Sequence, residues 1–404
     1  MKVLMLGWEL PPHNSGGLGV ACYHLCKALA RSGVDIEFVV PYQADHGIDF
    51  MTVTAAVPQD VHAIYKSGIA YDSYKYVMAD GHEEWHGVFD QQAMYEHAVK
   101  DLVMTQAFDI IHAHDWLTFR AALRAKEILG VPVIAHVHSV ESDRAGGNSG
   151  NPLVREIESL AFQAADRIVA VSDFTRSCIA RDYGIPYEKI DVVHNSIELA
   201  DLVPRDLSLA TTYQYLAALR AQGWRVVANV GRLTIQKGLP NFLRAAKLVV
   251  ERAPKTMFLV IGSGEQYIEL IEQAADLGIA KHVIFTGFQR GKAWRDAFAI
   301  ADLFVMPSVS EPFGLVPLEA IGYGTPALIS KQSGVSEVLH AALKVDFWDV
   351  NEMASQIIAV VQNDQLRDEL FDNAARELKR FSWDSAAHKV RAIYHQAVPE
   401  GAVA

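Results

Sequence analysis

Short apolar runs alternate with segments of helical periodicity along two long stretches of the chain. In the first stretch, runs of strand type occupy residues 3–6, 35–40, 109–113, 131–137, 167–171 and 191–193. In the second stretch, they occupy residues 225–230, 256–261, 282–286, 302–306 and 327–330. Strands that alternate with helices form parallel sheets whose two faces are both covered, which is why such strands are apolar throughout. The sequence therefore predicts an α/β fold with two Rossmann-like halves.

The 404 residues exceed what one typical core holds, which also indicates two domains. We expect a first domain over residues 1–195, a linker of weaker periodicity over 196–223 and a second domain over 224–380. A last helix is expected over residues 382–398 and is predicted to close back on the first domain. Ligands of open parallel sheets bind beyond the carboxyl ends of the strands, so the active site is expected in the cleft between the domains.

Composition excludes several classes of protein. The formal net charge of −12 argues against nucleic acid as a partner and against a broadly basic membrane-docking face. No apolar run reaches the roughly 18 residues of a membrane span, and the apolar start of residues 1–7 is too short for a signal peptide. We therefore expect a cytoplasmic protein without integral membrane association.

The three cysteines, Cys22, Cys26 and Cys178, show no paired spacing of a metal or redox motif. Cys22 and Cys26 lie four residues apart on the helix predicted over residues 17–31. They are interpreted as reduced, small core residues.

A strand, a turn and a helix follow one another in Val305–Glu319. The first amides of a helix have no intrahelical partner, so Gly314 and Leu315 can offer N–H groups to a phosphate. Glu311 and Glu319 flank these amides, and carboxylates accept hydrogen bonds from sugar and ribose hydroxyls. The stretch therefore predicts a site for a nucleotide-sugar.

The loop after the first strand of the second half carries two cations, Arg232 and Lys237, at the opening of a helix. An arginine fork and a lysine charge can embrace a diphosphate and neutralise it as it leaves. The alternative is a pair of solvated surface cations. Gly262 and Gly264 form a similar glycine turn after the next strand and are expected to shape a pocket for the nucleotide base.

The loop before the first predicted helix contains the glycine pair Gly16 and Gly17. A nicotinamide-binding fold places its first glycine directly after the strand, whereas this pair comes nine residues after Gly7. The spacing disfavours an oxidoreductase with a dinucleotide cofactor. It still allows close backbone approach to a phosphate or a sugar.

Histidines follow two predicted strands of the first half. Residues 112–116 read His-Ala-His-Asp-Trp, and His136 and His138 end the strand that follows. His138 can donate to a sugar hydroxyl or stabilise positive charge at the reacting carbon. Each pair could bind a metal, but no cysteine or carboxylate at a recognisable spacing completes either one. No metal is expected, and the chain has no Asp-x-Asp pair of the kind that holds a metal diphosphate.

Residues 42–105 are the least regular part of the chain. Five aromatic residues cluster there, and their rings could stack on sugars: Tyr65, Tyr71, Tyr74, Tyr76 and Trp85. The other interpretation is a packed insertion with a helix near residues 91–103.

Taken in order, these motifs resemble those of retaining glycosyltransferase family four, which includes the bacterial glycogen and starch synthases. The resemblance rests on the glycine loop, His-x-His-Asp-Trp, His138, Gly-Arg-Leu-x-x-x-Lys-Gly, the E-x7-E stretch and the closing Phe-Ser-Trp helix. It implies the GT-B fold, two Rossmann-like domains with a C-terminal crossover helix. It also implies catalytic roles for His138, Glu311, Arg232, Lys237 and Asp115. Donor-binding roles are implied for Gly16, Gly17, Arg232, Lys237, Gly262, Gly264, Glu311, Phe313, Gly314, Leu315 and Glu319.

The activity implied is transfer of glucose from ADP- or UDP-glucose to an α-glucan, without a metal or another cofactor. Glucose 1-phosphate, giving maltose 1-phosphate, and a surface or lipid-linked glycan remain alternative acceptors. A glycan-binding protein without catalysis is a further alternative. The chain departs from the family in lacking the lysine two residues before the glycine pair, where Asn14 and Ser15 lie nearby, and in reading His194-Asn195-Ser196 at the expected domain link. The donor base is therefore left open.

Overall fold

The computed structural model describes residues 1–13, 16–57, 61–66, 74–78, 80–202 and 211–398. The chain folds as two compact units. The first comprises Met1–Glu141, Gly150–Ser196 and Trp383–Ala404, and the second comprises Ser142–Ser149 and Ile197–Ser382. In the part of the chain described, no helix is both long enough and apolar enough to cross a membrane.

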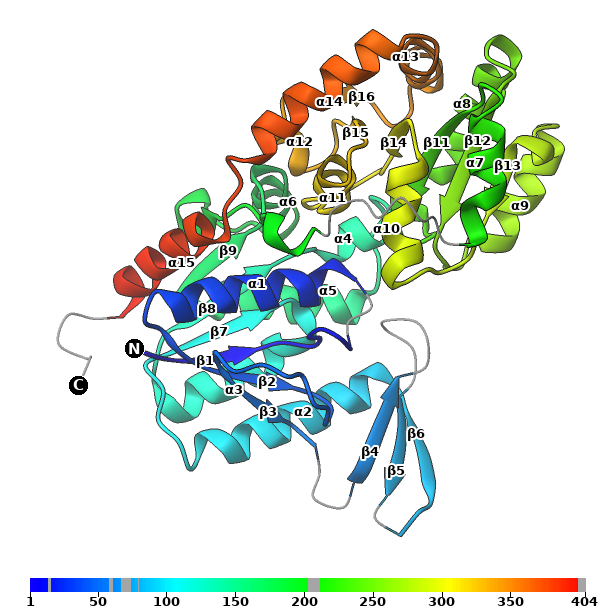
Figure 1. Cartoon of the computed structure of the whole chain (residues 1–404). Helices are drawn as coiled ribbons and strands as arrows, with labels where there is room; N and C mark the ends of the chain where they lie inside the picture. The colour runs from blue at the N-terminus through cyan, green and yellow to red at the C-terminus, as the bar shows by residue number, and fades with distance from the viewer. Residues whose placement is uncertain (14–15, 58–60, 67–73, 79, 203–210, 399–404) are drawn as a thin grey trace. The chain divides into compact units, whose positions relative to one another are not determined.

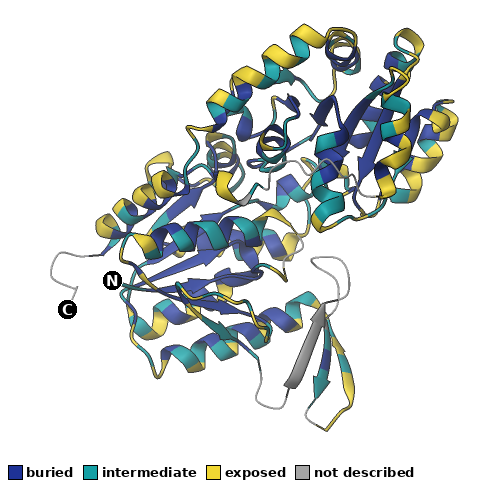
Figure 2. Cartoon of the chain, in the orientation of Figure 1, coloured by how far each residue is buried: buried dark blue, intermediate teal, exposed yellow. Residues whose placement is uncertain are grey.

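The first unit is built on a parallel sheet of seven strands in the order β10-β9-β8-β7-β1-β2-β3. The strands are β1 (Lys2–Leu6), β2 (Asp35–Val40), β3 (Thr52–Ala55), β7 (Ile110–His114), β8 (Val133–Val137), β9 (Arg167–Ala170) and β10 (Ile190–Val192). Five of these described strands, β1, β2, β7, β8 and β9, are largely apolar and almost wholly buried, as predicted for a sheet covered on both faces (Figure 2), whereas the edge strands β3 and β10 are more exposed.

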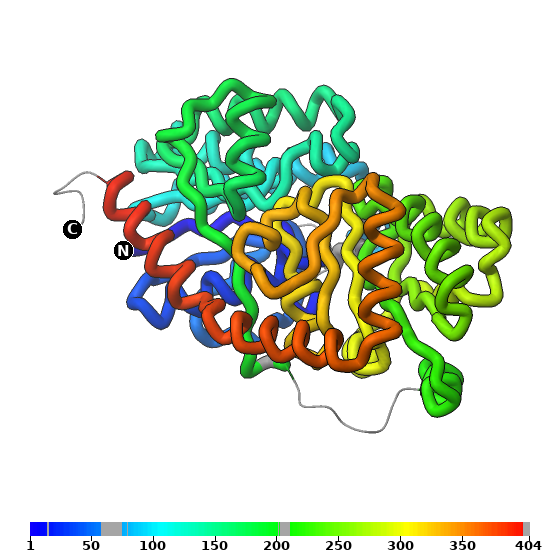
Figure 3. The backbone as a smooth tube through the Cα atoms, turned by 90° about the horizontal axis from the view of Figure 1, so that it is seen from above, coloured from blue at the N-terminus to red at the C-terminus, as the bar shows by residue number. Residues whose placement is uncertain are grey.

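Helices cover both faces of this sheet. Helices α1 and α15 pack against each other on one face, while α2 and α3 pack together on the other (Figure 1). The C-terminal segment thus lies beside the N-terminal one (Figure 3), and the helix predicted over residues 382–398 is confirmed. The helices are α1 (Gly17–Arg31), α2 (Val88–Val103), α3 (Trp116–Leu129), α5 (Pro152–Ala164), α6 (Asp173–Tyr183) and α15 (Trp383–Ala397).

A small antiparallel sheet of β4 (Val61–Lys66), β5 (Tyr74–Met78) and β6 (Glu83–His86) precedes α2. Tyr76 is fully buried and hydrogen-bonds Gln91, so its ring belongs to the core, whereas Trp85 is exposed. The side chains of Tyr65, Tyr71 and Tyr74 lie outside the described residues. The packed insertion with a helix near residues 91–103 is therefore confirmed for Tyr76 and α2.

The second unit contains a parallel sheet of six strands in the order β13-β12-β11-β14-β15-β16. Helices pack on this sheet, with α8 against α13 on one face. The strands are β11 (Arg225–Val230), β12 (Thr256–Ile261), β13 (Val283–Phe285), β14 (Leu303–Met306), β15 (Ala327–Ser330) and β16 (Leu343–Val345). The helices are α4 (Glu141–Arg144), which starts one residue before this unit, α7 (Gln214–Arg220), α8 (Leu239–Arg252), α9 (Tyr267–Asp276), α10 (Gly291–Ile300), α11 (Val316–Gly322), α12 (Val335–Val338), α13 (Val350–Gln362) and α14 (Asp364–Leu378).

The stretch predicted as a linker contains ordered structure at its end. Tyr213 is fully buried and leads into α7, whose residue Leu216 is also buried. These residues belong to the second unit because their apolar side chains pack into it. The short length of α7 explains why its periodicity is weak in the sequence.

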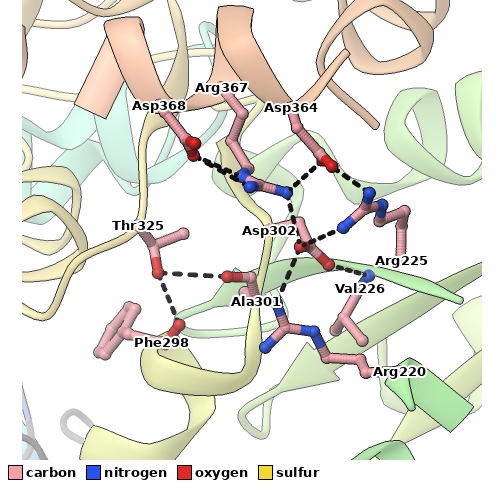
Figure 4. Close-up of polar contacts among 10 residues, drawn as sticks. All are labelled: Arg220, Arg225, Val226, Phe298, Ala301, Asp302, Thr325, Asp364, Arg367 and Asp368. Atoms are coloured by element: carbon pink, nitrogen blue, oxygen red, sulfur yellow. Dashed lines mark hydrogen bonds and ion pairs between the residues drawn. The ribbon is translucent and has the colours of Figure 1, made fainter. Parts of the chain in front are cut away.

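A buried carboxylate, Asp302, organises the amino-terminal edge of the second sheet (Figure 4). Its Oδ1 lies 2.9 Å from Arg220 Nη2, 3.5 Å from Arg225 Nη1 and 3.4 Å from Arg367 Nη1. Its Oδ2 accepts the Val226 N–H at 2.8 Å. One side chain therefore ties α7, β11 and α14 to the start of β14.

Asp302→Asn is expected to lower the free energy of unfolding by about 1.5–3 kcal/mol, because the amide must turn an NH2 group toward the arginines or the Val226 N–H. Urea unfolding measures this. The control is Asp368→Asn, whose side chain is 67% exposed in its pair with Arg367 and should cost under about 1 kcal/mol. Equal costs would show that Asp302 acts as an ordinary surface partner.

Candidate active site

Lys237 and Glu311 meet at the carboxyl edge of the second sheet. Lys237 ends the 3-10 turn Ile235–Lys237 after β11, and Glu311 lies in the turn after the neighbouring strand β14. The Lys237 Nζ lies 2.6 Å from Glu311 Oε2, which also accepts the Ser308 hydroxyl at 2.9 Å. The side chains are 20% and 12% exposed, so solvent screens this pair only partly. Two residues that the sequence assigned separately thus form one ion pair, and Ser308 was not predicted at all.

The backbone of Glu311 is fixed by the loop that follows β15. Its N–H donates to the Gln332 carbonyl and its own carbonyl accepts the Gly334 N–H, each at 2.9 Å. Among the described residues, no group hydrogen-bonds the second carboxylate oxygen, Oε1. Glu311 is therefore held rigidly with one oxygen available for a ligand hydroxyl.

Gly238 lets the Lys237 turn approach the Glu311 turn closely. It has φ +67°, and a Cβ placed on it would lie 2.1 Å from the Pro307 carbonyl oxygen. Gly278 has a similar φ of +72° but open space around its missing Cβ. The two glycines thus separate the cost of a left-handed conformation from the cost of close backbone packing.

Gly278→Ala is expected to cost about 1 kcal/mol of stability through φ alone. Gly238→Ala should cost about 2 kcal/mol more, because the Pro307 strand end must move away. It should also lower activity, because the neighbouring Lys237 is displaced together with Gly238. Urea unfolding and turnover of both variants measure these effects, and equal losses would contradict the packing argument.

The amides of Gly314 and Leu315 precede α11, which begins at Val316. Gly314 has φ +102°, and a Cβ there would lie 3.2 Å from both Glu311 Cγ and Met306 Sδ. In the described parts of the chain, neither amide donates a hydrogen bond. The arrangement can therefore receive an oxyanion beside Glu311.

The two remaining residues of this motif differ in accessibility. Glu319 is half-buried, its Oε2 has no hydrogen-bond partner within the described residues, and burial raises the pKa of its carboxyl to about 7. Phe313 is buried, with 3% exposure, and its carbonyl accepts the Val335 N–H. Glu319 Oε2 is thus able to accept a hydrogen bond from a ligand, whereas the Phe313 ring is part of the core.

Arg232 is exposed and makes no ion pair with any described residue. Gly262 and Gly264 serve the packing of its loop, since Cβ atoms on them would lie 1.7 Å from the Gly231 carbonyl oxygen and 2.3 Å from that of Leu233. The two glycines thus allow the loops after β11 and β12 to pack closely.

In the first unit, Asp115 joins the ends of two strands. Its Oδ1 accepts the N–H groups of His138 at 2.7 Å and Ser139 at 3.2 Å. Its φ of +59° and ψ of 171° lie in a region that normally only glycine adopts, and such strain concentrates at functional sites. Asp115 therefore positions His138 through the backbone.

The histidines of β7 and β8 form one cluster on a single face of the sheet. His112 Nε2 lies 2.9 Å from His136 Nδ1, and His114 Nδ1 lies 2.9 Å from His138 Nε2. Burial lowers the pKa of all four imidazoles, that of His138 to about 3. All four are therefore neutral at physiological pH.

No sequence spacing joins a cysteine to a histidine pair, but the fold brings Cys22 close to two of the histidines. Cys22, His114 and His138 form one group of possible metal ligands, and His112, His114 and His136 form another, with ligand atoms within 4.8 Å of one another. The sequence did not indicate this proximity, because Cys22 lies on α1, about 90 residues or more before the histidines. The facing nitrogens are nevertheless 2.9 Å apart, closer than the about 3.3 Å between two ligands of a tetrahedral zinc, and this is the distance of a hydrogen bond. Cys22 and Cys26 are buried in the core, as predicted; Cys178 is also buried, and none of the three forms a disulfide.

Gly16 and Gly17 are exposed where α1 begins, with Gly16 in an extended conformation before the helix. The two residues before them, Asn14 and Ser15, lie outside the described residues. The predicted glycine loop is thus placed at a helix N-terminus.

Family models match both halves of the chain. A model of "Glycosyltransferase Family 4" matches residues 15–201, and one of "Glycosyl transferases group 1" matches residues 218–377. Solved structures that the chain resembles include sucrose-phosphate synthase of Thermosynechococcus elongatus, with 18% identity, a TM-score of 0.74 and coverage of 98% of both chains. Another is the Anabaena protein HepE in complex with UDP-glucose, with 20% identity, a TM-score of 0.69 and coverage of 98% of this chain and 100% of that one.

Two relatives extend over nearly the whole chain. The D-inositol 3-phosphate glycosyltransferase of Salinispora tropica is 32% identical over 96% of this chain and 82% of its own length. The glycogen synthase of Mycobacterium tuberculosis is 28% identical over 98% of this chain and 94% of its own. With its two parallel α/β sheets, the chain therefore belongs to glycosyltransferase family 4 and is a transferase of the GT-B fold.

Proposed function

We propose that this glycosyltransferase moves glucose from ADP- or UDP-glucose to an α-glucan, with retained configuration and without a metal ion or another cofactor. The observation that carries the proposal is the Lys237–Glu311 pair beside the amides of Gly314 and Leu315, which donate to no described residue. A cation and amides suit a leaving diphosphate, while a carboxylate suits sugar hydroxyls. Similarity to a glycogen synthase over 98% of the chain supports the glucan acceptor.

In the proposed reaction, the bond between the sugar C1 and the donor phosphate oxygen breaks. The acceptor oxygen bonds to C1 on the same face, and its proton passes to the departing phosphate. Lys237, Arg232 and the amides of Gly314 and Leu315 would stabilise the diphosphate as its charge grows, and the Gly16–Gly17 amides would serve the same donor. No protein nucleophile is needed, because the leaving phosphate is the base.

The carboxylates are assigned to hydroxyl groups. Glu311 would accept a hydrogen bond from the transferred sugar through Oε1, and Glu319 one from the ribose through Oε2; neither oxygen has a partner among the residues that the structure describes. A hydroxyl donated to Glu319 would remove the cost of burying its charge. Gly262 and Gly264 would keep the Arg232 loop in place, and His138, positioned by Asp115, would face the reacting sugar.

A phosphorylated small acceptor is the second candidate. The 32% identical relative of Salinispora tropica is a D-inositol 3-phosphate glycosyltransferase, which favours an acceptor such as an inositol phosphate or glucose 1-phosphate. The donor and the residues around Lys237 would serve the same roles in that reaction.

The test is release of nucleotide from ADP-, UDP- and GDP-glucose with glycogen, maltooligosaccharides, glucose 1-phosphate or D-inositol 3-phosphate, with and without EDTA. We expect release that depends on an α-glucan and survives EDTA. Dependence on a sugar or inositol phosphate instead would establish the second candidate. No nucleotide release with any of these donors and acceptors would overturn both candidate functions and direct the search to surface or lipid-linked glycans as acceptors.

A further inference from the structure

His112 and His114 of β7 and His136 of β8 share one face of the first sheet because alternate residues of a strand point the same way, and His138, directly after β8, stacks on His136. His114 lies opposite His136 in the strand register, and Tyr394 of α15 hydrogen-bonds His112 on the same face. Each neutral imidazole carries one N–H and one lone pair, so every hydrogen bond in the cluster restricts where the protons lie.

Met5 determines which ring nitrogen of His114 carries the proton. The His114 Nε2 lies 3.1 Å from Met5 Sδ on the neighbouring strand β1. A thioether has no hydrogen to donate, so only a protonated Nε2 makes this contact favourable. His114 is neutral because burial lowers its pKa well below the ordinary value. Its Nδ1 is therefore a lone pair, which can only accept.

His114 in turn determines which ring nitrogen of His138 carries the proton. The His114 Nδ1 faces His138 Nε2 at 2.9 Å, so His138 must donate from Nε2. A neutral His138 then carries a lone pair at Nδ1, which no described residue hydrogen-bonds. Through His114, the Met5 sulfur thus makes His138 Nδ1 a hydrogen-bond acceptor.

We propose that His114 is a positioning residue that holds His138 as its Nε2–H tautomer, so that His138 Nδ1 accepts a hydrogen bond from a substrate hydroxyl. This reverses the sequence-based expectation that His138 donates to a sugar hydroxyl. The step from tautomer to substrate rests on the proposed function, in which His138 faces the sugar. The tautomer itself does not.

The first measurement needs no substrate. In the full chain labelled with 15N in its histidine rings, with EDTA present, long-range 1H–15N correlations report which ring nitrogens carry protons. We expect protonated Nε2 and bare Nδ1 for both His114 and His138, identified by the signals lost in His114→Asn and His138→Asn. In Met5→Leu, which keeps the volume and removes the acceptor, the protonated Nδ1 form of His114 should appear. A protonated His138 Nδ1 in the unaltered protein would overturn the proposal whatever the activity is.

The second measurement separates positioning from packing. His114→Asn keeps an acceptor oxygen near the place of Nδ1 but leaves space, whereas His114→Phe keeps the ring volume and removes the acceptor. We expect kcat/KM to fall about tenfold in His114→Phe, the size of one hydrogen bond, and to recover largely in His114→Asn. A role in packing alone predicts the opposite order, with activity following thermal stability, and that result would overturn the proposal.

A soft metal ion would compete for the same lone pairs. Addition of one equivalent of Zn²⁺ to the labelled, EDTA-free protein is expected to leave the ring nitrogen signals unchanged. Binding through Cys22, His114 and His138 would shift the signals of both rings, and this outcome would replace the proton chain with a metal site.

Discussion

Replacing Lys237 by methionine is expected to lower kcat by about 10²–10³ while KM for the donor changes little. In the proposed reaction the ammonium would stabilise charge that grows on the diphosphate as the bond to the sugar breaks, so its loss is expected to weaken the transition state more than the bound substrate. In the structure this charge is balanced by Glu311 at 2.6 Å, within a pair that is 20% and 12% exposed. An incoming diphosphate would meet a cation that is already positioned and partly desolvated. Steady-state kinetics with the donor identified in the panel measure the effect.

The control is Lys255→Met, which removes the same charge and volume elsewhere in this unit. Lys255 is exposed, donates to the Gln222 carbonyl at 3.2 Å and precedes β12, at the opposite edge of the sheet. Its replacement should leave kcat unchanged. Full activity of Lys237→Met, with urea unfolding showing lower stability, would mean that Lys237 serves only to neutralise Glu311.

Most strands of the two parallel sheets were predictable because burial on both faces makes them largely apolar. β11 and β12 lie at the predicted residues, and β14 begins one residue later, since Asp302 serves the arginines. β16 (Leu343–Val345) and β3 (Thr52–Ala55) were not predicted, because they are short and contain polar residues. Local periodicity carries too little signal for such edge strands.

The candidate site was predictable residue by residue but not as an arrangement. Sequence order could not show that Ser308 and Lys237 share one oxygen of Glu311, because that contact follows from the adjacency of β11 and β14. The histidine pairs were recognised singly, although their strand positions already implied a common face. In the proposed series of hydrogen bonds, the proton positions of His114 and His138 depend on Met5, an apolar residue on a third strand. Nothing in the sequence indicates that its sulfur accepts a hydrogen bond.

Stability of the first unit is expected to fall steeply below pH 6.5, by about 4 kcal/mol between pH 6.5 and 5.5. Burial holds the pKa of His112, His114, His136 and His138 below the roughly 6.5 of an unfolded chain. In that window the unfolded state binds protons that the folded state refuses, so the free energy of unfolding decreases as pH falls. Each histidine contributes up to about 1.4 kcal/mol per pH unit, and four together approach the whole stability of an ordinary domain. The exposed His82, whose pKa is raised by Glu84 and Asp80, acts in the opposite sense but weakly.

Urea unfolding at pH 7.5, 6.5 and 5.5, followed by a probe in the first unit, measures this dependence. His138→Asn should reduce the slope by about one quarter, because one of four equivalent proton-binding terms disappears. His97→Gln is the matched control, since His97 is 71% exposed beside Asp101 and should leave the slope unchanged. A stability that stays flat down to pH 5.5 would mean that the cluster takes up protons in the folded state. Such protons would also occupy the lone pair that His138 Nδ1 is proposed to offer, so transfer would be lost in the same pH range without unfolding.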